Sequence, residues 1–266
     1  MSGGRRIALH AVAALACAIL LGGCVSSASP ANSTRVAEPA GRGHEAWSVV
    51  ALGDSVPSGY NCGCTPYPEL SATSLTVPAT RDVAATNDAV NGFTSSDVLR
   101  QLRSDSDVSS DVRKADVVEI EVGANDVAYS GSCRTSVDCY QSTIPAIKQN
   151  LPEIVAQVRE LTKGHPVLVV LLDYWNVWLG GQYAKARGPG YVDAADTVTD
   201  QVNTIIKGTA IETGSSYVDL RAAFKGPDYD NDETGYLASD GDHPNMAGHE
   251  QIAAAVVDVI TRTRRL

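Results

Sequence analysis

The feature of this sequence that most constrains its fold is an alternation of short apolar runs with longer amphipathic segments. Four runs are rich in β-branched residues and end at turn residues, as buried strands do. They span residues 48–52, 117–122, 166–172 and 216–220. Four other segments carry apolar residues at helical spacing, over residues 94–104, 144–162, 193–213 and 246–263. This order predicts an α/β fold with a parallel sheet covered by helices on both faces.

The N-terminal part of the chain does not follow this alternation. Arg5 and Arg6 precede an apolar run over residues 7–21, which is short for a bilayer span and is typical of a signal peptide. Leu21-Gly22-Gly23-Cys24 resembles the lipobox of bacterial lipoproteins, in which the cysteine is lipidated and becomes the new N-terminus. The alternative is an ordinary secretory signal with an incidental cysteine. We predict a signal peptide over 1–23 and a lipid on Cys24.

Residues 24–45 are rich in Ser, Ala, Pro and Gly and show no apolar periodicity, which is typical of a flexible tether. The remaining residues, 46–266, contain neither an internal repeat nor a second linker, so we predict one domain. The protein would be exported and anchored on the extracellular face of the cell membrane. The motif does not distinguish the general from the twin-arginine export route.

The charge of the chain restricts its partners. The formal net charge is −10, and removal of the signal peptide leaves 19 basic and 31 acidic residues, a net charge of −12. This argues against nucleic acid, because phosphate binding requires clusters of Lys and Arg. It also argues against electrostatic docking on anionic lipid. Membrane attachment would therefore come from the lipid on Cys24.

Four cysteines lie in the predicted domain: Cys62, Cys64, Cys133 and Cys139. An even number in an exported protein predicts two disulfides, whose pairing the sequence leaves open. A zinc site is the alternative, although the CxC and Cx5C spacings differ from the usual ligand spacing. Both pairs lie in loops predicted at the same edge of the sheet, where local or loop-to-loop bridges would brace the rim of a site.

Polar residues follow the predicted strands at the edge where parallel α/β folds bind ligands. Ser55 follows the first strand, and a serine needs a base to become a nucleophile. His243 is the best candidate, because it stands in a loop bounded by Gly241 and Pro244. Asp240 can fold back to orient this histidine, whereas Asp242 would normally point away.

An acyl-transfer site also needs donors for the negative charge that develops on the carbonyl oxygen. The backbone N–H of Ser55, the backbone N–H of Gly92 and the side-chain amide of Asn125 are the candidates. All three follow apolar segments at the predicted ligand-binding edge.

These blocks, in this order, resemble the SGNH hydrolase family, often called GDSL esterases and lipases. The blocks are GDS (53–55), NG (91–92), GAND (123–126) and DGDHPN (240–245). Val56 stands where the family usually has Leu. The resemblance implies a three-layer α/β/α sandwich with a five-stranded parallel sheet. It also implies a triad of Ser55, His243 and Asp240, and Gly92 and Asn125 in the oxyanion hole.

The resulting hypothesis is a lipid-anchored, monomeric serine esterase or lipase that forms an acyl-enzyme and needs no cofactor or metal. Its substrate would be a small-molecule, lipid or sugar ester. The alternatives are an acyltransferase or carbohydrate deacetylase with the same site, and a non-catalytic surface binding lipoprotein. The intact Ser, His and Asp set argues against the last.

Two further segments allow two readings each. Tyr174, Trp175 and Trp178 follow the third apolar run and could line a substrate pocket or simply pack the sheet edge. Residues 228–233 resemble the start of a Ca²⁺ loop but lack the glycine required at the sixth position, which favours a solvated acidic loop.

Overall fold

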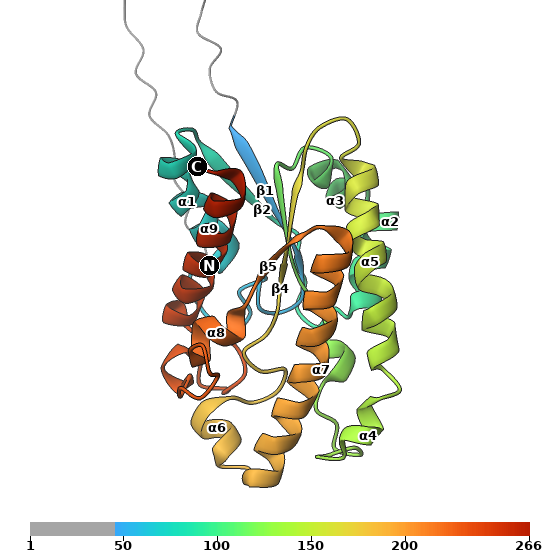
Figure 1. Ribbon diagram of the computed structural model, residues 1–266, viewed down its shortest axis with the longest axis vertical. Helices are drawn as coiled ribbons and strands as arrows, with labels where there is room; N and C mark the ends of the chain where they lie inside the picture. The colour runs from blue at the N-terminus through green and yellow to red at the C-terminus, as the bar shows by residue number, and fades with distance from the viewer. Residues whose placement is uncertain (1–45) are drawn as a thin grey trace, which may run out of the picture. The chain divides into compact units, whose positions relative to one another are not determined.

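The structure is a computed structural model, and it describes residues 46–266 (Figure 1). The predicted signal peptide, the lipidation site at Cys24 and the predicted tether lie outside the described residues. None of the helices within 46–266 is both long enough and apolar enough to cross a bilayer.

A five-stranded parallel sheet with the strand order β2-β1-β3-β4-β5 forms the centre of the described region. The strands are β1 (Trp47–Gly53), β2 (Val83–Asn87), β3 (Val117–Glu121), β4 (Leu168–Leu172) and β5 (Ser216–Val218). Every neighbouring pair is parallel. The prediction of a parallel α/β sheet with five strands is confirmed.

Helices cover both faces of this sheet (Figure 1). One face carries α1 (Tyr67–Ala79), α8 (Leu220–Lys225) and α9 (Met246–Arg264). The other carries α2 (Ser95–Ser104), α3 (Ser106–Val112), α5 (Ile144–Leu161) and α7 (Pro189–Thr213). Four short elements lie in the loops: η1 (Ala124–Val127), α4 (Val137–Tyr140), α6 (Gly181–Lys185) and η2 (Thr234–Tyr236). The three layers are those that the sequence resemblance implies.

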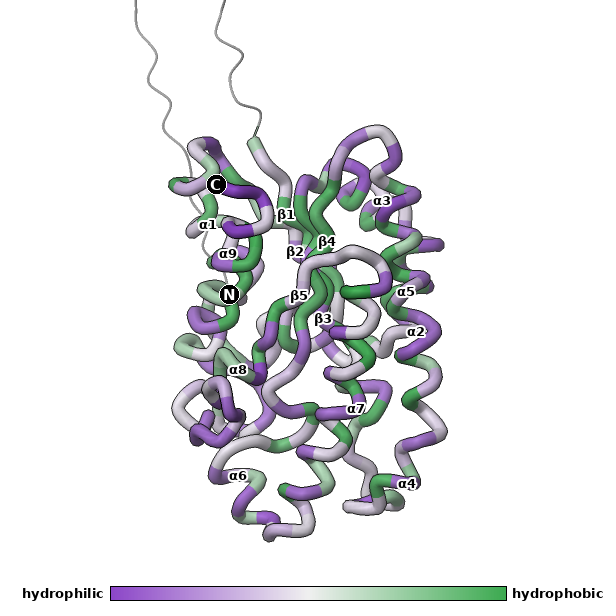
Figure 2. The backbone as a smooth tube through the Cα atoms, in the orientation of Figure 1, coloured by the Kyte–Doolittle hydropathy of each residue, from purple (hydrophilic) through white to green (hydrophobic). Residues whose placement is uncertain are grey.

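Side chains of successive strand residues enter two different cores. Leu52 and Ile120 pack in the core under α2, α5 and α7, whereas Val49 and Val170 pack in the core under α1 and α9. A strand buried on both faces needs apolar residues at consecutive positions, which explains the continuous apolar runs in the sequence. Figure 2 shows hydrophobic strands at the centre, flanked by helices in which hydrophobic and hydrophilic residues alternate.

Two elements have no clear sequence signal. Strand β2 lies at the edge of the sheet and is only partly buried, so it has no continuous apolar run. Helix α1 contains Pro68 and Pro78, which obscure the helical period. The fourth apolar run ends as a strand at Val218, because Asp219 caps α8 by accepting a hydrogen bond from the backbone N–H of Ala222 at 2.7 Å.

Strand β3 brings two carboxyl groups, Glu119 and Glu121, into the core on the α1 side, where both are fully buried. Ser71 Oγ of α1 lies 3.0 Å from Glu119 Oε1. Burial raises the pKa of Glu119 to about 8, although the hydrogen bond from Ser71 acts in the opposite direction. Burial also raises the pKa of Glu121 well above its ordinary value. Both groups therefore favour the neutral form in the folded protein.

Replacing Glu119 with glutamine should flatten the pH dependence of stability. The folded protein retains a proton on Glu119 up to about pH 8, whereas the unfolded chain releases it near the ordinary value of 4.5. The corresponding stability is complete below pH 4.5 and is lost as the pH rises through about 8. Urea denaturation at about pH 5 and about pH 9 should therefore show a smaller stability loss in the variant than in the wild type. Glu250→Gln, at an exposed position, is the control and should lose as much stability as the wild type. An equal loss in Glu119→Gln and the wild type would contradict the raised pKa of Glu119.

Candidate active site

The site lies where the order of the strands reverses. The chain passes from β1 to β2 and then returns past β1 to β3, so the connections after β1 and β3 lead to helices on opposite faces. Such a reversal leaves a crevice at the carboxyl ends of the strands, where open parallel sheets bind ligands. Ser55 enters this crevice from β1, and Asn125 enters it from β3.

Gly53 makes this close approach of β1 and β3 possible. Its backbone has a φ of 148°, which favours glycine. A Cβ atom at this position would lie 2.0 Å from the carbonyl oxygen of Glu121. The same oxygen accepts a hydrogen bond from the backbone N–H of Asp54 at 3.2 Å. The glycine of the GDS block therefore sets the position of the backbone that carries Ser55.

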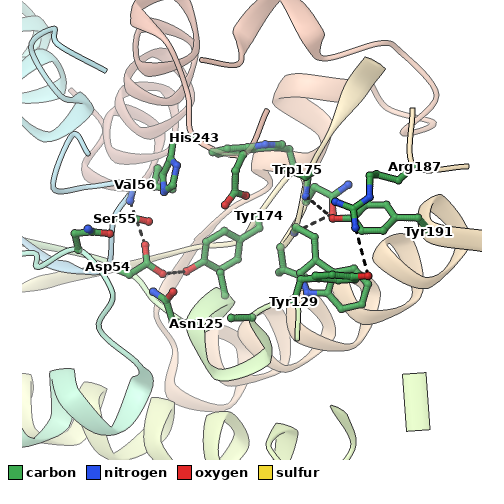
Figure 3. A pocket seen from close by; sticks show the side chains of 18 residues that line it. Asp54, Ser55, Val56, Asn125, Tyr129, Tyr174, Trp175, Arg187, Tyr191 and His243 are labelled. Atoms are coloured by element: carbon green, nitrogen blue, oxygen red, sulfur yellow. Dashed lines mark hydrogen bonds between the residues drawn. The ribbon is translucent and has the colours of Figure 1, made fainter. Parts of the chain in front are cut away.

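A pocket of about 300 Å³ occupies the crevice. Ser55, Asn125 and His243 all line it, although they come from three distant parts of the chain. Figure 3 shows Ser55 and His243 close together on one side of the pocket. Ser55 is 9 % exposed, so its hydroxyl reaches the pocket from an otherwise buried backbone.

Asp240 and His243 form the hydrogen-bonded pair that their spacing predicts. Asp240 Oδ2 lies 2.7 Å from Nδ1 of His243. Asp240 Oδ1 accepts hydrogen bonds from the backbone N–H groups of Asp242 and His243, each at 3.1 Å. Burial raises the pKa of Asp240, but the hydrogen bonds from His243, Asp242 and Asn61 outweigh it and leave the pKa below its ordinary value. The carboxylate is therefore ionised at neutral pH.

The donors predicted for an oxyanion differ in their position. The backbone N–H groups of Ser55 and Gly92 donate to no other group within residues 46–266. Asn125 lines the pocket, and its Nδ2 donates to the carbonyl oxygen of Phe93 at 3.0 Å, which leaves its second amide hydrogen. Gly92 itself does not line the pocket, but the preceding residue, Asn91, does. Ser55 Oγ and the His243 ring form no hydrogen bond with each other in the structure of residues 46–266.

With this geometry in place, a comparison of sequences assigns the family. A model of the GDSL-like lipase/acylhydrolase family matches residues 51–251. The chain belongs to this family. It is therefore a carboxylic ester hydrolase, and the resemblance seen in the four sequence blocks is confirmed. No curated protein sequence matches the chain significantly.

Solved structures share the fold of this GDSL-like hydrolase at low sequence identity. The lipase Lip_vut3 from a goat rumen metagenome has 21 % identity and a TM-score of 0.63, with 80 % of this chain and 97 % of that chain covered. Phospholipase A1 from Streptomyces albidoflavus NA297 has 22 % identity and a TM-score of 0.59, with 81 % and 98 % covered. A point variant of Axe2, an acetyl xylan esterase from Geobacillus stearothermophilus, has 22 % identity and a TM-score of 0.57, with 80 % and 94 % covered.

The GDSL-like hydrolase has a contact at this site that its sequence did not reveal. Asn61 Nδ2 donates to Asp240 Oδ2 at 2.6 Å, so the same oxygen that faces His243 has a second donor. The ring of Tyr60 packs edge-on against the ring of His243, with 5.0 Å between their centroids. Asn61 has a φ of 62°, a conformation that asparagine tolerates better than most residues. An asparagine in a loop was the only feature of the sequence that could have indicated this contact.

Asp54 of the GDS block is fully buried, and its carboxylate points to the hydroxyl of Tyr174 (Figure 3). Its Oδ2 accepts a hydrogen bond from the hydroxyl of Tyr174 at 2.6 Å, and its Oδ1 accepts one from the backbone N–H of Val56 at 3.2 Å. Burial raises its pKa to about 7, although the bond from Tyr174 lowers it. Asp54 thus holds the turn that carries Ser55, and the sequence assigned it no role.

The three aromatic residues considered as pocket candidates, Tyr174, Trp175 and Trp178, all line the pocket of the GDSL-like hydrolase, and all are buried. Trp178 Nε1 donates to the carbonyl oxygen of Val127 at 2.8 Å. Trp175 stacks on Phe224 with 4.2 Å between the ring centroids. These side chains therefore pack the sheet edge and also form part of the pocket wall. That the substrate contacts them stays a prediction.

The cysteines pair locally in the structure, Cys62 with Cys64 and Cys133 with Cys139. The first bridge directly follows Asn61, and the second lies in the loop between η1 and α5. Cys62, Cys64 and His249 bring their ligand atoms within 4.8 Å of one another. Because the two sulfurs are bonded to each other, they offer no thiolates to zinc.

Two other histidines, His165 and His249, and the acidic loop bind groups of the protein itself. His165 lies at the opposite edge of the sheet, where its Nε2 is 3.1 Å from the carbonyl oxygen of Ala115. His249 is fully buried and accepts a hydrogen bond from the backbone N–H of Tyr67 at 3.2 Å. In the acidic loop 228–233, Asp232 pairs with Lys185 and Glu233 accepts from the backbone N–H of Gly181. These carboxylates bind protein groups rather than converging on a Ca²⁺ position.

Proposed function

We propose that this chain is an exported, lipid-anchored serine hydrolase that cleaves carboxylic esters through an acyl-enzyme. Ser55 is the nucleophile, His243 the general base and Asp240 the group that orients the base. The observation that carries the proposal is the 2.7 Å contact between Asp240 and His243, together with the presence of His243 and Ser55 in the lining of one pocket. Export and anchoring rest on the lipobox at Cys24 and on the paired cysteines.

The first half of the reaction forms the acyl-enzyme. Ser55 Oγ attacks the ester carbonyl carbon as Nε2 of His243 removes its proton. The Asp240 carboxylate accepts from Nδ1 and stabilises the imidazolium that forms. The backbone N–H groups of Ser55 and Gly92 and the amide of Asn125 are the donors for the oxyanion. The imidazolium then protonates the leaving alcohol, and the ester C–O bond breaks.

The second half releases the acid. Water attacks the acyl-enzyme carbonyl while His243 takes its proton. His243 then returns the proton to Ser55 Oγ as the bond between Oγ and the acyl carbon breaks, which releases the acid and regenerates the hydroxyl. An acyltransferase would use an alcohol in place of this water. His243 is partly exposed, which gives water access to the base, so hydrolysis is the reaction that we propose.

Labelling with a fluorophosphonate tests the proposal, because only an activated serine reacts with it. Peptide mapping should place the label on Ser55 in the full chain, and p-nitrophenyl esters of short acids should be hydrolysed. Ser58 is the nearest serine, and its hydroxyl donates to the carbonyl oxygen of Ser55 at 2.8 Å. Ser58→Ala should still be labelled. An unlabelled wild type would favour a non-catalytic binding lipoprotein instead.

Replacing Asn61 with aspartate should lower kcat roughly ten- to a hundredfold. The substitution removes the donor that holds the Asp240 carboxylate and places a second carboxylate beside it. The added negative charge favours the protonated form of the His243 ring, which cannot act as the base. The acid limb of the pH profile of kcat/KM should therefore move to higher pH, a change that a general loss of stability would not produce. Asn231→Asp adds the same charge at an exposed position and should leave the profile unchanged. An unshifted profile in Asn61→Asp would show that Asn61 does not act through Asp240.

A further inference from the structure

One part of the pocket carries a positive charge that the proposed reaction does not use. Arg187, in the turn between α6 and α7, is the only lysine or arginine among the described residues that line the pocket. Figure 3 places it with Tyr129 and Tyr191 on the side away from Ser55 and His243. The chain as a whole is strongly acidic, so this charge is a local exception.

Two tyrosine rings hold the guanidinium. Its carbon lies 5.3 Å from the ring centroid of Tyr129 and 5.0 Å from that of Tyr191. One nitrogen, Nη2, donates to the Tyr129 hydroxyl at 3.4 Å. Tyr191 is itself fixed, because its hydroxyl accepts a hydrogen bond from the backbone N–H of Leu179 at 3.1 Å. Packing against rings orients the guanidinium without using most of its N–H donors.

Arg187 has no acidic partner in the described part of the chain. None of the ion pairs within residues 46–266 includes it. Asp242 lines the same pocket but forms no ion pair with Arg187. A planar guanidinium with free donors is suited to carboxylate and phosphate groups, which it can bind through two parallel hydrogen bonds.

The pocket is therefore electrostatically asymmetric. Asp242 directly precedes His243 in the chain and lines the pocket, and burial raises its pKa to about 6. A negative group on the substrate would be repelled by Asp242 once it ionises and attracted by Arg187. An anionic part of the substrate would thus lie at the Arg187 end, while its ester lies at Ser55.

We propose that Arg187 binds an anionic group, a carboxylate or a phosphate, on the ester that this hydrolase cleaves. The inference rests on the proposed function and names the substrate class of the same site. A carboxylate would come from an acyl or alcohol part with a free acid, and a phosphate from a phospholipid headgroup. The test has a separate arm for each source.

The test compares neutral and anionic esters of matched size. The first pair is p-nitrophenyl valerate and mono-p-nitrophenyl glutarate, and the second is dihexanoylglycerol and dihexanoylphosphatidic acid. Arg187→Gln removes the charge and keeps polar contacts, Arg187→Lys keeps the charge without the paired donors, and Arg113→Gln removes a charge elsewhere. We expect Arg187→Gln to lower kcat/KM about tenfold more for the anionic member than for the neutral one, through KM. Arg187→Lys should lie between, and Arg113→Gln should match the wild type.

Two results would overturn the inference: an equal loss for both members of each pair in Arg187→Gln, or a wild type that does not favour the anionic member of either pair. If no ester is cleaved, the proposed function fails. A binding measurement then tests whether Arg187 binds an anion. Trp175 and Trp178 line the pocket, so glutarate or inorganic phosphate should change the tryptophan fluorescence of the wild type. Binding that is weaker in Arg187→Gln would support the inference without any turnover, whereas equal or absent binding would refute it.

Discussion

Replacing Ser55 with alanine should lower kcat/KM for short acyl esters at least about a thousandfold and abolish fluorophosphonate labelling. Ser58, the next serine along the chain, directs its own hydroxyl to the Ser55 carbonyl oxygen and not to the His243 ring. The variant retains the backbone donors at the oxyanion position, so a low residual rate above that of water is expected.

The loss in Ser55→Ala should come without unfolding. The hydroxyl of Ser55 makes no hydrogen bond to another group in the described part of the chain and faces the pocket. The free energy of unfolding should therefore change by less than about 1 kcal/mol, as measured by urea denaturation. His243→Ala should lower kcat/KM by a similar factor. The double variant should lower it little further than either single one, because the two groups act as a unit. Turnover of Ser55→Ala at a rate near the wild type would refute the assignment of the nucleophile.

Replacing Gly53 with alanine should destabilise the protein by about 3 kcal/mol or more. A positive φ of 148° strains any side chain, and the added Cβ would lie 2.0 Å from the carbonyl oxygen of Glu121 in the middle of the sheet. To relieve this overlap, β1 and β3 must separate near their carboxyl ends. That movement would also break the hydrogen bond from Asp54 N to Glu121 O and displace Ser55.

Gly208→Ala provides the matched control. Gly208 lies inside α7, its φ is not positive, and an added Cβ would contact nothing within 4 Å. Alanine there should stabilise the protein by about 0.5–1 kcal/mol through its higher helix propensity. Thermal denaturation of both variants gives the comparison. A Gly53→Ala variant as stable as the wild type would show that β1 and β3 can separate at no cost.

The parallel sheet could be predicted because its central strands are buried on both faces. Strand β4 appears in the sequence as a continuous apolar run for this reason, and β3 as an apolar run interrupted by the buried Glu119 and Glu121. Strand β2 could not be found in the same way, because it is an edge strand with partly exposed side chains. Helix α1 was missed because its prolines interrupt the periodicity on which such predictions depend.

The contacts of the site were also predictable only where the two residues are close in sequence. Asp240 and His243 are three residues apart, so one turn of the loop determines their contact, and the spacing alone predicts it. Asn61 and Asp240 are 179 residues apart, and no local pattern relates them. The same holds for Tyr174 and Asp54, which are 120 residues apart. These contacts exist only because the loops after different strands end at one edge of the sheet.

The sequence by itself determined the fold class, the family and the order of the four blocks, since each depends on residue types at short spacing. Only the tertiary structure decided which loops meet, how the cysteines pair, and that Arg187 lies between Tyr129 and Tyr191 in the pocket. The physical reason is the range of the interactions. Turn preference and apolar periodicity act over a few residues, whereas a pocket is formed by loops whose positions depend on the packing of the whole sheet.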